Sequence, residues 1–185
     1  MNFYSILELG AANWPAAVAI ADTQRCLTYK ELGGATERLA THLKHAGIRE
    51  GDKVGVMFPK GIEDIVACFA VMRAGGIVVQ MSPAWKASEI VQLSERVDMD
   101  VFCYSPQYQA LIPQEGKRQV LELAPQQSLP VCLQWAGTNN VAAERRQQLL
   151  HLNPASIGFS SGTMSESKGI IISHDALWAR ARTEG

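Results

Sequence analysis

The sequence lacks the marks of several protein classes. No Lys or Arg precedes the apolar residues of the opening stretch MNFYSILELGAANW, which argues against a secretory signal. The charge-free apolar run at 65–72 stops at Arg73, far short of the roughly 20 residues that span a bilayer. The net charge is −1 and no basic stripe occurs, so nothing favours nucleic-acid binding. We expect a soluble cytoplasmic protein without a membrane span.

The cysteines lack the spacing of a metal or redox site. The four are Cys26, Cys68, Cys103 and Cys132, and no two form a C-x-x-C pair. Each lies in or beside an apolar stretch. We therefore expect buried, reduced thiols rather than disulfides or a zinc site.

The elements predicted from apolar periodicity alternate between strands and helices. Helices are expected at 3–12, 29–46, 61–74, 86–97 and 141–152 and from residue 173 or 174 onward. Strands are expected at 17–22, 26–29, 53–58, 77–81, 100–104, 119–123, 131–135, 156–159 and 169–173. Since 47% of the residues are apolar, a core can form. This order predicts an α/β fold, with a mainly parallel sheet and helices on both faces.

The stretch FSSGTMSESKG, residues 159–169, is the strongest chemical signal. It holds five hydroxyl side chains, two glycines and one lysine between two apolar runs. Phosphate oxygens need donors, which backbone N–H groups, hydroxyls and an ammonium supply. Gly162 permits close approach of the backbone, and Lys168 adds charge.

Other interpretations of this loop are weaker. A Walker A loop would place Gly before Lys168 and Ser or Thr after it, but Ser167 and Gly169 stand there, and the β-branched run that follows predicts a strand. Ser165 and Lys168 match S-x-x-K of serine acyl-enzymes, but that motif needs a helix and its companion motifs are absent. A solvated hairpin loop that binds nothing remains as an alternative.

Several ordered motifs resemble the ATP-dependent adenylate-forming superfamily, which includes acyl-CoA synthetases, aryl-acid ligases, luciferases and peptide-synthetase adenylation domains. SSGTMSESKGIIISH resembles its phosphate-binding signature. The earlier matches are LTYKEL at 27–32, Gly47 with GDKV at 51–54, AGG at 74–76 and SP at 82–83. The likeness extends over about residues 3–178 and is loose between 105 and 150.

The resemblance implies a reaction that joins a carboxylic acid to ATP as an acyl-adenylate and releases pyrophosphate. Most members then pass the acyl group to coenzyme A or to a carrier-protein phosphopantetheine. The implied ligands of the ATP phosphates, with Mg²⁺ nearby, are Ser160, Ser161, Gly162, Thr163, Met164, Ser165 and Lys168. The stretch VVQMSPAW is equally similar to acyl-CoA synthetases and peptide-synthetase domains, so the acid and the acyl acceptor stay open.

The loop departs from the family pattern at three positions. Met164 replaces a Thr or Ser and removes one hydroxyl, Ser165 stands where Gly is usual, and Ser167 stands where Pro is common. Losing one donor to a charged group costs about 1.5–3 kcal/mol when nothing replaces it. A loop with weakened affinity is therefore a second hypothesis.

The family's later elements are missing from these 185 residues. They include an aromatic-Gly-x-Thr-Glu stretch, a Gly-Asp element for ribose, the hinge and the lysine of a small C-terminal domain. Residues 1–185 thus resemble a partial N-terminal domain, and Leu177 and Trp178 are expected to lack a partner surface. We expect a truncated chain that is inactive alone and has no catalytic residue of its own. It would serve as part of a ligase or as a binding module that docks on another chain, on the missing remainder or on a second copy.

Remaining polar and aromatic residues are interpreted as structural. His42 and His45 are expected to be surface residues without a third metal ligand. Glu63 and Asp64 open a helix, where acidic side chains suit the dipole. His174 is left between ligand contact and helix capping. Trp85, Trp135 and Trp178 are expected in the core or an interface, and Ile65, Phe69 and Met72 are expected in the core.

Overall fold

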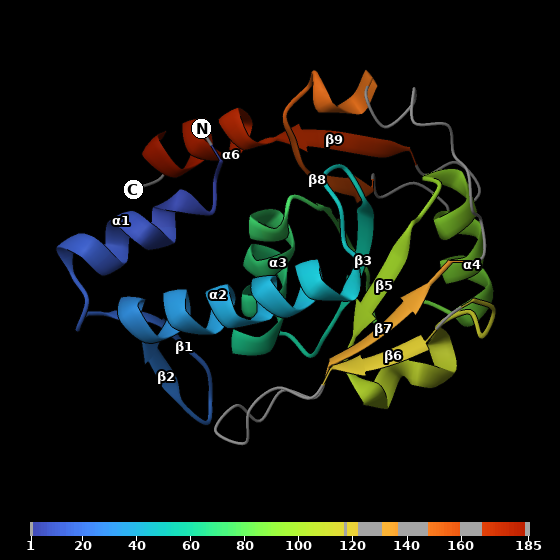
Figure 1. The fold of residues 1–185 in the computed structure, drawn as a ribbon, viewed down its shortest axis with the longest axis horizontal. Coiled ribbons are helices and arrows are strands. Elements are labelled where there is room, and N and C mark those ends of the chain that lie inside the picture. Colours follow the sequence, from blue (N-terminus) through green and yellow to red (C-terminus); the bar gives the residue numbers. More distant parts are fainter. Residues whose placement is uncertain (1, 117, 122–130, 137–147, 160–167, 184–185) are drawn as a thin grey trace.

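The computed structural model describes residues 2–116, 118–121, 131–136, 148–159 and 168–183. Figure 1 shows the arrangement of the helices and strands. The helices are α1 (Ser5–Asn13), α2 (Tyr29–Ala46), α3 (Ile62–Ala74), α4 (Ala87–Arg96) and α6 (His174–Thr183), with a 3-10 turn at Pro106–Leu111. The strands are β1 (Val18–Ala21), β2 (Cys26–Thr28), β3 (Lys53–Met57), β4 (Ile77–Gln80), β5 (Val101–Tyr104), β6 (Arg118–Leu121), β7 (Val131–Trp135), β8 (Pro154–Phe159) and β9 (Gly169–Ser173).

The described strands form a two-stranded hairpin and one larger sheet. Strands β1 and β2 pair antiparallel. The larger sheet has the order β6-β7-β5-β3-β4-β8-β9. Its four central strands, β5, β3, β4 and β8, run parallel, while β6, β7 and β9 join antiparallel. The predicted α/β fold with a mainly parallel sheet is confirmed as a mixed, mostly parallel one.

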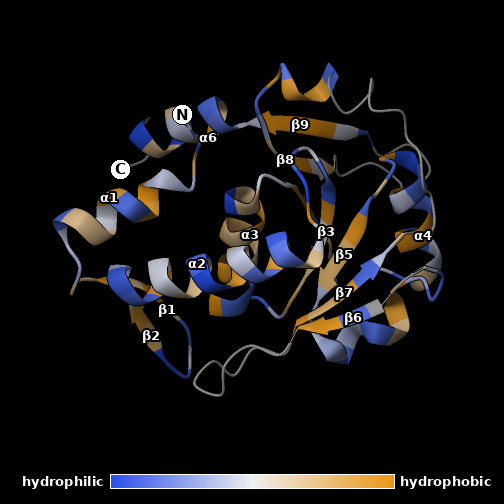
Figure 2. Ribbon diagram, in the orientation of Figure 1, coloured by the Kyte–Doolittle hydropathy of each residue, from blue (hydrophilic) through white to orange (hydrophobic). Residues whose placement is uncertain are grey.

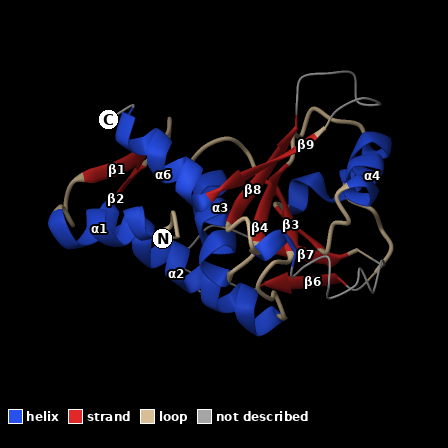
Figure 3. Cartoon of the chain, turned by 90° about the horizontal axis from the view of Figure 1, so that it is seen from above, coloured by secondary structure: helices blue, strands red, loops and turns tan. Residues whose placement is uncertain are grey.

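Helices cover both faces of this sheet, as predicted. Helices α2 and α3 lie on one face and α4 lies on the other (Figures 1 and 3). The central strands β3 and β5 are buried along their whole length because both of their faces are covered. Figure 2 shows β5 as a continuous hydrophobic strand, whereas α2 alternates between hydrophilic and hydrophobic residues.

Local sequence signals set the bounds of α2. The Thr28 side chain accepts a hydrogen bond from the Glu31 N–H, and the Glu31 carboxylate accepts one from the Thr28 N–H, so a capping box starts the helix. Gly47 ends it in the left-handed conformation with φ of 108°. Gly75 ends α3 in the same way with φ of 93°. These three boundaries agree with the sequence prediction.

Helix α6 packs on the start of the chain, which corrects one expectation. Leu177 and Trp178 were expected to lack a partner surface, but Leu177 packs against the core beneath α2 and α3. The Trp178 and Phe3 rings pack edge to face with their centroids 5.8 Å apart, and the Phe3 ring stacks on that of Phe69. The physical reason is that the N-terminal segment fills the space beside α6. Figure 1 shows the N-terminus next to this helix.

The predicted helix at 141–152 is described only at its end. Residues 148–150 are helical, and residues 141–147 lie outside the described part. In the predicted core stripe, Met72 is buried, while Ile65 and Phe69 are half-buried against the core. The three tryptophans Trp85, Trp135 and Trp178 are half-buried. They therefore lie at the margin of the core.

The prediction for the cysteines is confirmed in part. All four are free thiols, and Cys103 and Cys132 are buried. Cys26 is exposed and Cys68 is half-buried, so the prediction that all four are buried is wrong for these two. Cys26 begins β2, and this strand belongs to the small β1–β2 hairpin rather than to the main sheet. No helix within the described residues is both long and apolar enough to cross a membrane.

Thr36 in α2 should limit the stability of the chain. Its Oγ1 atom is buried and has no hydrogen-bond partner among the described residues. Replacing Thr36 by Val keeps the shape of the side chain and removes the unpaired group, so the free energy of unfolding should rise by about 1 kcal/mol. Thermal unfolding should then shift upward by about 2–4 °C. The exposed Thr41→Val variant is the matched control, and an unchanged or lower midpoint for Thr36→Val would contradict the prediction.

Candidate functional site

Two antiparallel strands flank the candidate phosphate loop. Strand β8 ends at Phe159 and β9 begins at Gly169, and these two residues face each other in the register of the pair. The loop therefore closes a hairpin, as predicted. This geometry argues against the Walker A interpretation, which places a helix where β9 stands. The S-x-x-K interpretation concerns residues 165–168, of which only Lys168 lies within the described part of the chain.

The described residues include only the last of the predicted phosphate ligands. Lys168 is exposed and directly precedes β9. Six predicted ligands lie outside the described part of the chain: Ser160, Ser161, Gly162, Thr163, Met164 and Ser165. Their assignment stays a prediction.

The hairpin leaves the sheet at the edge where parallel α/β folds bind ligands. Strands β3, β4, β5 and β8 all run in the same direction, so their carboxyl ends share one edge. Val79 of β4 faces Ile157 of β8, which places the end of β4 beside the end of β8. The residues that follow Phe159 therefore start at this carboxyl edge.

The Trp85 ring supports the last residue of β8. The Trp85 and Phe159 rings pack edge to face, with their centroids 5.9 Å apart. Trp85 lies just before α4, in the segment that follows β4. The residue that begins the candidate loop is thus packed against the connection that leaves the neighbouring strand.

Comparison with known proteins decides the family. The sequence profile named AMP-binding enzyme matches residues 7–184. The chain belongs to this AMP-binding family. The resemblance found in the sequence is therefore confirmed, although the profile does not test which side chains touch phosphate.

The curated relatives of this AMP-binding chain are much longer proteins. The chain is 31% identical over 178 residues to nonribosomal peptide synthetase 4 of Gibberella zeae, covering 92% of this chain and 2% of that protein. It is 29% identical over 173 residues to the dapdiamide synthesis protein DdaD of Enterobacter agglomerans, covering 94% of this chain and 26% of that protein. The chain thus spans a small part of the relatives that it matches.

Solved structures confirm the fold. A nonribosomal peptide synthetase, FmoA3, bound to α-methyl-L-serine-AMP matches 98% of this chain and 19% of its own, with a TM-score of 0.71 and 21% identity. The O-succinylbenzoate coenzyme A synthetase MenE of Bacillus subtilis, in complex with AMP, matches all of this chain and 45% of its own, with a TM-score of 0.70 and 16% identity. At these identities the likeness establishes the arrangement of the strands and helices.

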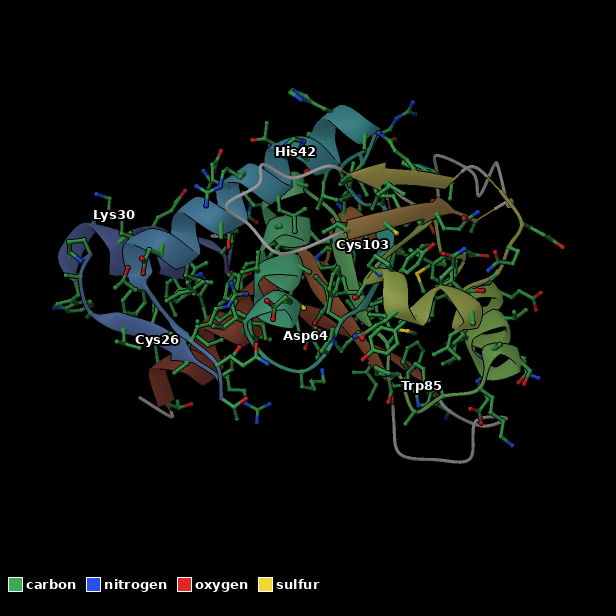
Figure 4. All side chains as sticks on the ribbon, turned by 90° about the horizontal axis from the view of Figure 1, so that it is seen from below. Cys26, Lys30, His42, Asp64, Trp85 and Cys103 are labelled. Atoms are coloured by element: carbon green, nitrogen blue, oxygen red, sulfur yellow. The ribbon has the colours of Figure 1, made fainter. Side chains whose placement is uncertain are left out.

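A polar network at the start of α3 was not predicted from the sequence. We call Lys60, Asp64, Cys68 and Gln80 the Asp64 network; Figure 4 labels Asp64. The Asp64 carboxylate accepts hydrogen bonds from Lys60 Nζ and Gln80 Nε2, each at 2.8 Å. The Cys68 thiol donates to Gln80 Oε1 at 3.1 Å. A sequence signal did exist, since Gln80 is the one polar residue of the apolar strand IVVQ.

Burial makes the Cys68 thiol unreactive. Burial, aided by the nearby Asp64 carboxylate, raises the pKa of Cys68 to about 12. The thiol therefore stays protonated near neutral pH and acts as a hydrogen-bond donor rather than a nucleophile. Glu63, the other acidic residue of this turn, forms an ion pair with Arg25. Both carboxylates thus have partners within the fold.

The described residues contain no cluster suited to a metal ion, when groups of three or more His, Cys, Asp or Glu side chains are considered. On α2, His42 is half-buried and His45 is exposed. No third ligand joins them within the described ranges.

His174 links the two ends of the described chain. Its ring is buried, and Nδ1 accepts a hydrogen bond of 2.9 Å from the backbone N–H of Phe3. The backbone N–H of His174 donates a hydrogen bond to the Asn153 carbonyl. The Ser173 hydroxyl accepts one from the Ala176 N–H and so caps the helix. Of the two roles left open for His174, packing at the start of α6 is the one that these contacts fill.

Stability should fall in mildly acidic solution because of His174. Burial lowers the pKa of this ring below its ordinary value of about 6.5. The unfolded chain then binds the proton more readily, so stability is full above about pH 6.5 and declines as the pH falls toward the folded-state pKa. Loss of one hydrogen bond of about 1 kcal/mol corresponds to a fall of about 2–4 °C in the unfolding midpoint.

The matched variants are His174→Asn, which keeps an acceptor near the Phe3 N–H, and His45→Asn on the exposed surface of α2. Thermal unfolding between pH 7.5 and 5 should show a flatter dependence for His174→Asn and an unchanged one for His45→Asn. Equal slopes for His174→Asn and the parent chain would refute the assignment.

Proposed function

We propose that this chain is the N-terminal part of the large domain of an ATP-dependent carboxylate–AMP ligase and that residues 160–168 hold the ATP β- and γ-phosphates. One observation carries the proposal. A hairpin rich in hydroxyls, with Gly162 and Lys168, joins β8 to β9 at the carboxyl edge of the parallel strands. Membership of the AMP-binding family supports it.

The proposed role follows from electrostatics. The acid's carboxylate oxygen attacks the α-phosphorus, the bond from this phosphorus to the bridging oxygen breaks, and pyrophosphate leaves. An anion approaches a polyanion in this step, so the phosphate charge must first be compensated. Hydroxyl and N–H donors of Ser160, Ser161, Thr163 and Ser165 would bind the phosphate oxygens, and Lys168 would add a positive charge.

Magnesium would supply further charge compensation when bound with ATP. The described residues hold no metal-ligating cluster, so we expect the ion to be held by the phosphates and mainly by parts of the enzyme outside this chain. Coenzyme A and a carrier-protein phosphopantetheine both remain candidate acceptors. The substrate is proposed only as a carboxylic acid.

The 185-residue chain should bind ATP through Lys168. Removing its ammonium should weaken ATP affinity by about tenfold to a hundredfold, the loss of one hydrogen bond to a charged group. Calorimetric titration of Lys168→Ala against the parent chain measures this, and Lys44→Ala, at an exposed position of α2, is the control of equal charge. Equal affinities for Lys168→Ala and the parent would defeat the loop assignment.

Binding without turnover is expected of these residues alone. The family's adenine, ribose and acyl-carboxylate elements do not occur in this sequence, so ATP with a panel of carboxylic acids should release no pyrophosphate. A coupled pyrophosphate assay provides the measurement. Acid-dependent pyrophosphate release above the background of heat-denatured chain would contradict this prediction, because these residues would then complete adenylation by themselves.

A binding module is the second candidate function, and the exposed edge strand β9 favours it. Ile170 is 53% exposed and Ile171 is 36% exposed on this edge strand, and Leu152 nearby is 53% exposed. Exposed apolar edge strands pair readily with other chains. In this alternative, Met164 and Ser165 have weakened nucleotide binding by the loop. The calorimetric titration of the parent chain would then detect no ATP binding.

A further inference from the structure

The Asp64 network leads from the interior of the sheet to a solvent-exposed ammonium. The Asp64 side chain is only 6% exposed, whereas that of its partner Lys60 is 70% exposed. A buried carboxylate requires partners that replace water, and Gln80 and Lys60 together bind both of its oxygens. Asp64 therefore holds one end of the Lys60 contact while most of the lysine stays open to ligands.

Helix stability does not account for this ammonium. Lys60 directly precedes Gly61, the N-cap residue of α3. Positive charge is unfavourable at this end of a helix, where the dipole is itself positive. A Lys four residues before an acid is also the less favourable order for a helical ion pair. The Lys60 ammonium therefore has no stabilising effect on the dipole of α3, which points to a role in contacts outside this helix.

The network lies beside the start of the candidate loop. In the β4–β8 register Val79 faces Ile157, so Gln80 lies next to Gly158, two residues before Ser160. Side chains alternate along a strand, which places Gln80 and position 158 on the same face, toward α3. A Cβ at Gly158 would meet nothing nearer than Ile172 Cδ1 at 3.8 Å. Because residue 158 is a glycine, no side chain at this position of β8 occupies the space beside the network.

We propose that Lys60 is a second cation for the polyphosphate and that Asp64 and Gln80 are its positioning residues. This inference rests on the proposed function, because it needs a polyphosphate at the carboxyl edge. The ligand carries several negative charges, and Lys168 supplies one positive charge. Lys60 reaches the same edge from the segment after β3, so two cations from different strands compensate the charge together.

The test uses inorganic tripolyphosphate as the probe of the 185-residue chain. Lys60→Gln should weaken tripolyphosphate binding by about tenfold, and Lys60→Arg should restore most of it. Lys44→Gln removes the same charge at an exposed position in the last turn of α2, and it should leave tripolyphosphate binding unchanged.

Asp64→Asn tests the positioning role. It should weaken tripolyphosphate binding by the parent chain and have no further effect in the Lys60→Gln chain, where no ammonium is left to position; a general loss of folding would weaken binding in both. Thermal unfolding of each variant is measured alongside.

The outcomes separate the two proposals. If Lys168→Ala weakens tripolyphosphate binding and Lys60→Gln does not, the role of Lys60 is wrong and the proposed function stands. If the parent chain binds no tripolyphosphate, the proposed function fails and the role of Lys60 fails with it. Parallel weakening in Lys60→Gln, Lys60→Arg and Lys44→Gln would also overturn the inference, since it would show an unspecific effect.

Discussion

The parallel pairing of β4 with β8 is the constraint on which the candidate site depends. It joins segments that are more than 70 positions apart in the chain, Val78 with Ser156 and Val79 with Ile157. Because β3, β4 and β8 run in one direction, the segments after all three strands lie at one edge of the sheet. The end of β8 at Phe159, the connection carrying Trp85 and the segment carrying Lys60 lie at the same edge for this reason. Without the pairing these segments would be unrelated.

The two faces of the sheet serve this edge differently. On the α4 face, the Trp85 ring fixes the Phe159 ring at the end of β8. On the α3 face, the Asp64 network replaces apolar packing with hydrogen bonds and brings an ammonium outward. An unpaired buried polar group costs stability, and each member of the Asp64 network finds a partner within it. The carboxyl edge therefore combines a rigid apolar support with a charged one.

Local signals in the sequence predicted some elements to the residue. Helix α2 begins after Thr28 and ends before Gly47, as the sequence predicted, since caps act within one turn of the chain. Strand β9 also has the predicted bounds. Contacts between distant residues were not predictable in this way. The hydrogen bond from the Phe3 N–H to His174 joins positions 171 apart. The same N-terminal segment provides the surface on which α6 packs, which the sequence did not predict. The site could be placed at a hairpin from its motif, whereas the Asp64 network needed the fold, because its members come from α3, β4 and the segment between β3 and α3.

The central claim is that residues 160–168 bind the anionic end of a nucleotide. Backbone amide NMR of the 15N-labelled chain, titrated with magnesium and ATP, measures this residue by residue. The account predicts that the largest shift changes occur at the amides of 160–168 and saturate together. Changes confined to other segments, or none at saturating ATP, would contradict it.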